Sequence, residues 1–147
     1  MNASTDALPE VTSAAAIQRL AEDPVELHAR DAYLIFRSLC KLSMKTLGSE
    51  SERDLKSHGM RSKLLSLQLL KSILHAYMPI FASPDVLLHN HTGAMSFGQA
   101  VKQYLFLQLS RNAPSAIIQV FELSCDIFWR VVMGMRKQAK VSPFMCH

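Results

Sequence analysis

KSHGMRSKLLSLQLLKSILHAY (residues 56–77) carries the strongest helical signal in this chain and decides its fold. Its apolar residues recur at steps of three and four and form two adjacent stripes of one helix. The stripes comprise Met60, Leu64, Leu67, Leu70, Leu74 and Tyr77, and then Leu65, Leu69, Ile73 and Ala76. A helix that is apolar over more than half its circumference is typically buried between neighbours. The sequence therefore predicts a central helix, whose end is bracketed by Pro79 and Pro84.

A second helix is predicted before this segment, from about Glu26 to Leu47. Gly48 suits its end, and the polar stretch GSESERD (48–54) predicts a linker. The apolar residues of this helix share one face, namely Ala32, Ile35, Phe36, Leu39, Cys40, Leu42 and Leu47.

Two more helices are predicted after the central one. Residues 85–98 mix a short apolar turn with a Gly-bearing loop, after which a helical stripe runs to Leu109. Pro114 suits the first turn of the last helix. Asp126 and Arg130 lie four residues apart there, as an ion pair requires. The predicted buried face of this helix comprises Ile117, Val120, Phe121, Ser124, Phe128, Val131 and Met135.

The composition agrees with one helical core. The chain has 147 residues, of which 49% are apolar, and only 5 Gly and 6 Pro, which favours long helices over strands. Helices joined by short or polar links predict an all-α fold of antiparallel helical hairpins stacked as an armadillo/HEAT-like α-solenoid. Because no run of about 18 apolar residues and no secretion signal occurs, the sequence predicts neither export nor a membrane-spanning helix.

The net charge of +4 is unevenly distributed. Residues 1–54 hold 6 basic and 9 acidic side chains, whereas residues 55–147 hold 10 basic and 3 acidic ones. A basic surface attracts an acidic protein face, an anionic membrane or nucleic acid, although many such surfaces are simply solvated. The candidate contacts for an acidic partner or an anionic membrane are Arg37, Lys41, Lys45, Arg61 and Lys63. The rival interpretation is a stand-alone basic helical protein that binds nucleic acid, with steep salt dependence.

Trp129 is a further candidate contact, because it directly follows Phe128. Two adjacent helical residues point about 100° apart, so the two rings cannot both face one core. One of them is expected to meet another helix or another protein. Cys40 and Cys125 lie on predicted apolar faces and are expected to act as small core hydrophobes.

No catalytic, metal or cofactor site is predicted. The cysteines Cys40, Cys125 and Cys146 lack the paired spacing of a zinc site, and His89 and His91 lack a third ligand at diagnostic spacing. The chain contains no phosphate loop and no nucleophile motif.

Three stretches identify a family: RDAYLIFRSLCKLSMK (30–45), KSHGMRSKLLSLQLLKSIL (56–74) and QAVKQYLFLQLSRNAPSAIIQVFELSCDIFWRV (99–131). In this order and spacing they resemble the helical region upstream of the exchange domain in the large trans-Golgi Arf guanine-nucleotide exchange factors, of the BIG and fungal Sec-seven type. The resemblance covers about residues 25–140.

The resemblance implies a non-catalytic regulatory module that packs on the N-terminal dimerisation and cyclophilin-binding module of the same factor. It also implies a cytoplasmic protein, peripheral at Golgi and trans-Golgi membranes, that meets Arf-family or related small GTPases through the full-length factor and binds no nucleic acid. The exchange domain with its catalytic glutamate lies outside this sequence. The Asn-Tyr/Phe-Asp-Cys box of family members is also absent.

The predicted organisation is a flexible leader (1–24), the N-terminal part of a helical regulatory domain (25–140) and a tail, VSPFMCH (141–147), unlike the family. Val141 and Ser142 are what a retained splice donor encodes after a lysine codon, so a truncated fragment is expected.

Leu67 provides the first test of this interpretation. Replacing it with aspartate buries an unpaired charge in the central helix, so Leu67→Asp is expected to unfold the domain. Circular dichroism and thermal melting measure the effect. A mutant with unchanged helix content and melting would show that the central helix is misplaced.

Overall fold

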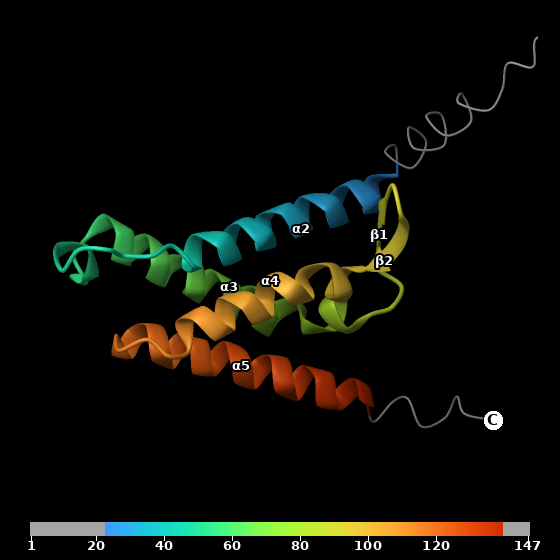
Figure 1. Ribbon diagram of the computed structural model, residues 1–147. Coiled ribbons are helices and arrows are strands. Elements are labelled where there is room, and N and C mark those ends of the chain that lie inside the picture. Colours follow the sequence, from blue (N-terminus) through green and yellow to red (C-terminus); the bar gives the residue numbers. More distant parts are fainter. Residues whose placement is uncertain (1–22, 140–147) are drawn as a thin grey trace, which may run out of the picture.

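The computed structural model describes residues 23–139, and α-helices dominate this part of the chain (Figure 1). The helices are α2 (Pro24–Ser43), α3 (His58–Ala82), α4 (Phe97–Asn112) and α5 (Ile118–Ala139), with a short 3₁₀ helix η1 (Ser51–Arg53) between α2 and α3. Strands β1 (Leu87–Asn90) and β2 (Gly93–Ser96) form a small antiparallel hairpin between α3 and α4. The all-helical prediction is confirmed, apart from this hairpin.

Successive helices run in opposite directions, so that α2 with α3 and α4 with α5 form two helical hairpins side by side (Figure 1). Helix α3 packs on α2 along one side and on α5 along the other, while α4 packs mainly on α2. Because α2 and α4 are each the first helix of a hairpin, they run parallel to each other (Figure 1).

Helix α3 supplies the centre of the core through one face only. Met60, Leu67 and Leu70 are fully buried. Each such side chain stabilises the fold by about 2 kcal/mol. Leu65 (57% exposed) and Leu69 lie on the opposite face and are exposed, as are Ala76 and Tyr77. The predicted burial is therefore wrong for Leu65, Leu69, Ala76 and Tyr77, whereas Ile73 of the second stripe packs against the core. Helices α2 and α5 flank α3 and leave its outer face uncovered.

The same helical stretch, Ser51–Ala82, is long and apolar enough to cross a membrane by length and composition alone. Core helices pass the same test, and the face that includes Leu67, Leu70 and Leu74 accounts for part of this apolar character. The stretch is broken at the start by the exposed residues of η1.

Helix α2 is shifted relative to its prediction. It begins at Pro24, with the Asp23 carboxylate accepting a hydrogen bond from the Val25 N–H (3.0 Å). It ends at Ser43, four residues before the predicted end at Leu47. Its buried residues include Ala29, Phe36 and Cys40, whereas the predicted core residues Ile35 and Leu42 are exposed.

Helix α3 continues through Pro79 and ends at Ala82, between the two prolines that the sequence predicts to bracket its end. The backbone kinks at Tyr77 (φ −125°, ψ 22°), because Pro79 cannot donate the next helical hydrogen bond. Phe81 in the continued turn packs between the rings of Phe36 and Phe97, with both centroid distances 5.1 Å. These contacts explain why the helix persists to Ala82.

Helix α5 begins at Ile118, so Pro114 lies in the preceding loop rather than in the first helical turn. Its buried residues include Val120, Ser124, Ile127 and Val131. The predicted members Phe121 and Phe128 are instead 48% and 54% exposed, and the side chain of Met135 lies outside the described residues. The leader and tail predicted for 1–24 and 141–147 also lie outside them, except for Asp23 and Pro24.

The β-hairpin replaces the loop predicted for residues 85–98. Gly93 has a positive φ (131°), which a glycine adopts without strain, and Asn90 pairs with it across the turn. The Asn90 side-chain oxygen accepts hydrogen bonds from the N–H (2.9 Å) and the hydroxyl (2.7 Å) of Thr92. Leu88 from β1 is buried and anchors the hairpin on the helices.

Gly98 is expected to be essential where α4 begins against the end of α3. A Cβ there would overlap the carbonyl oxygen of Phe81, which is backbone and cannot rotate away. Gly98→Ala should therefore destabilise the fold by about 1–3 kcal/mol, which exceeds the helix-propensity gain of up to about 1 kcal/mol. Urea unfolding measures the difference. Gly48→Ala, whose nearest contact is 3.8 Å away, is the control and should change stability little; equal effects at both sites would contradict this packing.

Candidate protein-interaction surfaces

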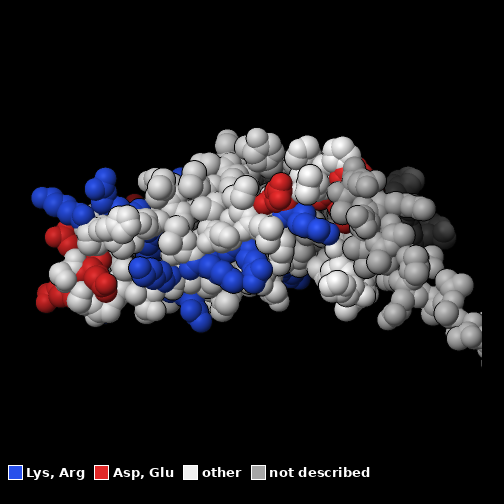
Figure 2. Space-filling view, turned by 90° about the horizontal axis from the view of Figure 1, so that it is seen from above, with Lys and Arg blue, Asp and Glu red and all other residues white. Residues whose placement is uncertain are grey.

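The predicted basic residues lie on α2, on the segment after it and on α3. Figure 2 shows a row of basic side chains on the face that α2 forms, with acidic side chains gathered toward the two ends of the row. Lys41 and Lys45 are exposed and Arg37 is half-buried. Arg37 and Lys41 lie one helical turn apart, whereas Lys45 follows the end of α2.

Arg37 is held by an aromatic side chain of α4. The centre of its guanidinium lies 5.3 Å from the centroid of the Tyr104 ring, in a cation–π arrangement. Tyr33 packs edge-on against the same ring at 6.4 Å. The pKa of Tyr33 is raised, mainly by burial and to a smaller extent by the hydrogen bond with Tyr104. Arg37, a predicted partner contact, is therefore packed against α4 and only half-exposed.

Lys63 is brought to the end of α2 by the packing of α3. Its ammonium donates a hydrogen bond to the carbonyl oxygen of Lys45 (3.3 Å), and burial lowers its pKa. Arg61 is exposed on α3. The structure therefore brings Lys63 into contact with Lys45. Trp129 lies far from these residues, because it belongs to α5, at the opposite edge of the domain from α2 (Figure 1).

A second surface is the aromatic face of α5, which we define as Ile118, Phe121, Phe128 and Trp129. Each of these side chains is between 48% and 67% exposed. The predicted burial of Phe128 is wrong, because Ile127 occupies the core position between the helices. A groove beside this face is lined by residues of α5 and of the end of α4, including Leu109 and Cys125. Cys125 is exposed, so its predicted core role is also wrong.

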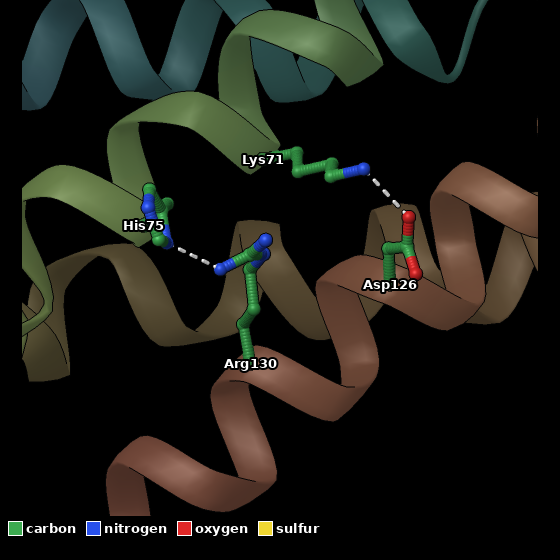
Figure 3. Close-up of polar contacts among 4 residues, drawn as sticks. All are labelled: Lys71, His75, Asp126 and Arg130. Carbon is green, nitrogen blue, oxygen red and sulfur yellow. Dashed lines mark hydrogen bonds and ion pairs between the residues drawn. The ribbon is translucent and has the colours of Figure 1, made fainter.

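Two polar contacts help to fix the rotation of α5 against α3 (Figure 3). Lys71 donates to the carboxylate of Asp126 (2.7 Å), and Arg130 donates to Nδ1 of His75 (2.6 Å). Because an arginine can only donate, His75 must accept through Nδ1 and carry its proton on Nε2. The predicted pair of Asp126 with Arg130 is therefore replaced by contacts from each residue to α3, and these help to turn the aromatic face outward.

The histidines of the hairpin do not assemble a metal site within residues 23–139, where no cluster of three metal-ligating side chains occurs. Nδ1 of His89 instead lies 3.1 Å from the carboxylate of Glu26, a buried residue of α2. This contact ties the hairpin to the first turn of α2.

Cys40 is the small core hydrophobe that the sequence predicts. It is fully buried, and burial raises the pKa of its thiol from 9.0 to about 12. The unfolded thiol ionises first as pH rises, so the stability linked to neutral Cys40 is complete below pH 9 and is lost between pH 9 and about 12.

The sequence pattern does not reveal that Tyr104 and Arg111 of α4 lie beside the basic residues of α2. Tyr104 contacts Arg37 of α2, and Arg111 follows Tyr104 by seven residues, about two turns, on the same face of α4. They occur inside one of the quoted family stretches, but only the parallel packing of α2 and α4 places them beside the basic residues of α2.

The family model described as "Mon2/Sec7/BIG1-like, HUS domain" matches residues 28–142. This chain belongs to the HUS-domain family of Mon2/Sec7/BIG1-like proteins. The resemblance seen in the sequence is thereby confirmed, and the nucleic-acid interpretation receives no support.

Curated relatives of this HUS-domain chain are named as exchange factors. It is 44% identical over 119 residues to the ADP-ribosylation factor guanine nucleotide-exchange factor sec71 of Schizosaccharomyces pombe, which covers 80% of this chain and 7% of the relative. It is 46% identical over 112 residues to the human brefeldin A-inhibited guanine nucleotide-exchange protein 1 (76% and 6%). It is 39% identical over 111 residues to SEC7 of Saccharomyces cerevisiae (76% and 5%). The chain thus spans less than a tenth of these relatives.

The two described cysteines should differ strongly in reactivity. In a Cys146→Ser variant at about pH 8, Cys125 is expected to react rapidly with a disulfide reagent. Cys40 should react only when the chain unfolds, because in the native state its thiol is buried and only about one in ten thousand is ionised at this pH. Stopped-flow absorbance measures both rates. In the control Cys125→Ser/Cys146→Ser, native-state labelling should disappear; rapid labelling would contradict the burial of Cys40.

Proposed function

We propose that this HUS-domain segment is a non-catalytic regulatory module of an Arf guanine-nucleotide exchange factor that acts in Golgi vesicle-mediated transport. It docks on other protein modules and helps to recruit the factor to the membrane. The family match and the names of the relatives support this setting. The exposed aromatic face of α5 is the observation that carries the docking role.

An exposed cluster of large aromatic side chains is typical of a protein interface. Phe128 and Trp129 are 54% and 62% exposed, and they line the same groove. Aromatic residues beside such a groove provide anchor points for a partner and are enriched among residues that dominate binding energy. Water contact is unfavourable for these rings, so covering them stabilises a complex.

The resemblance indicates the partner. The proposed occupant of the aromatic face is the N-terminal dimerisation and cyclophilin-binding module of the same factor. The proposed domain runs over residues 25–140, and Arf-family GTPases are reached through the full-length factor, whose exchange domain performs catalysis. The proposed location is cytoplasmic and peripheral at Golgi and trans-Golgi membranes.

Disrupting the aromatic face should weaken docking. The double variant Phe128→Asp/Trp129→Asp is expected to bind the separately purified N-terminal module at least about tenfold more weakly than the unchanged chain. Isothermal titration calorimetry measures the affinity, and binding by the unchanged chain should vary little with salt between about 0.05 and 0.5 M.

A matched control separates the aromatic face from general surface hydrophobicity. Leu27→Asp/Leu55→Asp changes two similarly exposed apolar residues, 48% and 45%, on other elements. It should bind as the unchanged chain does. Equal binding by both double variants, with intact circular dichroism, would remove the aromatic face from the docking site, and no binding by any form would overturn the proposed partner.

A further inference from the structure

One charged surface has no role in the proposed docking of the aromatic face. We define the basic strip as Arg37 and Lys41 of α2, Lys45 after it, and Arg111 of α4. Lys41, Lys45 and Arg111 are exposed and Arg37 is half-buried.

No ion pair within residues 23–139 involves the basic strip, and the nearby carboxylate that acts on it is that of Glu52, whose pKa is lowered by its backbone hydrogen bonds and, in smaller part, by Lys45. The ion pairs found there join Glu26 to Arg30 and to His89, and Asp126 to Lys71. Neighbouring like charges repel one another, so an added anionic group gains from several cations at once.

Arg37 is the member of the strip that packs against an aromatic ring. Its guanidinium lies over the Tyr104 ring, and its Nε is buried without a hydrogen-bond partner. Stacking on the ring fixes the planar group before any ligand arrives, which reduces the entropy lost on binding. A guanidinium held in this way suits a carboxylate, whose two oxygens match its fork of N–H donors.

The spacing of the strip matches carboxylates one helical turn apart. Arg37 and Lys41 are separated by about 6 Å along α2, since the rise is about 1.5 Å per residue. Arg111 lies at the level of the end of α2, because Nδ2 of the next residue, Asn112, is 3.5 Å from Oγ of Ser43. Leu34 lies about one turn before Arg37 and is 46% exposed. It offers an apolar contact at the end of the strip.

A protein segment fits these features better than a lipid surface. The carboxylate of a side chain can reach the half-buried Arg37, whereas a flat layer of headgroups meets the protruding lysines first. The aromatic residues that would anchor the domain in a bilayer, such as Trp129, lie on α5 at the other edge of the helical layer from α2 (Figure 1).

We infer that the basic strip binds an acidic segment of a protein partner, with one carboxylate on Arg37 and others on Lys41 and Arg111. This inference rests on the proposed function as a docking module and adds a second face with a partner of defined chemistry. Such binding is charge-dependent and should weaken steeply with salt, unlike docking on the aromatic face.

The test uses the full 147-residue chain and a fluorescein-labelled, alanine-based helical peptide that carries glutamate pairs four residues apart. Fluorescence anisotropy measures its affinity. Arg37→Glu/Lys41→Glu should weaken binding at least about tenfold. Lys41→Glu/Arg111→Glu, in which both positions are exposed, should do the same. Arg37→Lys keeps the charge but removes the fork of donors, so a loss of about threefold or more is expected.

The control Lys56→Glu/Arg136→Glu carries the same change in net charge at exposed positions outside the strip. It should bind the peptide nearly as the unchanged chain does. Equal losses in this control, or no loss when Lys41 and Arg111 are reversed, would overturn the proposal. Circular dichroism melting verifies that each variant folds.

A second measurement separates a protein segment from a membrane. Vesicles of phosphatidylcholine with about one-fifth phosphatidylserine are floated with each form of the chain. Strip variants that lose vesicle binding but keep peptide binding would overturn the proposal in favour of a lipid surface. Binding of the N-terminal module through the aromatic face is measured separately, so failure there leaves the peptide result interpretable.

Discussion

Burial of one face of α3 is the constraint on which the rest of the structure depends. Leu67, Leu70 and Leu74 are almost completely shielded from water, and α2 and α5 pack on either side of them. The apolar stripe of each helix, such as Val120, Ile127 and Val131 of α5, fixes how that helix is rotated against the core. Polar and aromatic contacts at the edges of the core add to this arrangement.

Those edge contacts help to create the two candidate interaction surfaces. On α5, the contacts of Asp126 and Arg130 with α3 leave the aromatic face exposed. Between α2 and α4, the stacking of Arg37 on Tyr104 aligns cations from two helices. Each contact is modest in energy, but it helps to decide which side chains face solvent. The same packing that stabilises the domain therefore separates an apolar surface from a basic one.

The two surfaces suit different kinds of partner. The aromatic face offers large rings beside a groove, and the basic strip offers several exposed positive charges. Helical modules of this kind bury their cores between successive hairpins and keep their outer faces available for recognition. In the two proposals, the aromatic face docks on a neighbouring module of the same factor and the basic strip binds an acidic segment.

The sequence by itself determined the helical class, the approximate extent of α3, α4 and α5, the core role of Cys40 and the family, because helical periodicity and long family stretches are local signals. It could not determine which apolar stripe of α3 is buried or that Phe128 and Trp129 are both exposed. Periodicity gives the width of an apolar face, whereas the positions of neighbouring helices decide which part is covered. The β-hairpin was missed because Leu88 gains its burial only from distant helices. Arg111 likewise joins the basic strip only through the parallel packing of α4 on α2, a contact between segments about 70 residues apart.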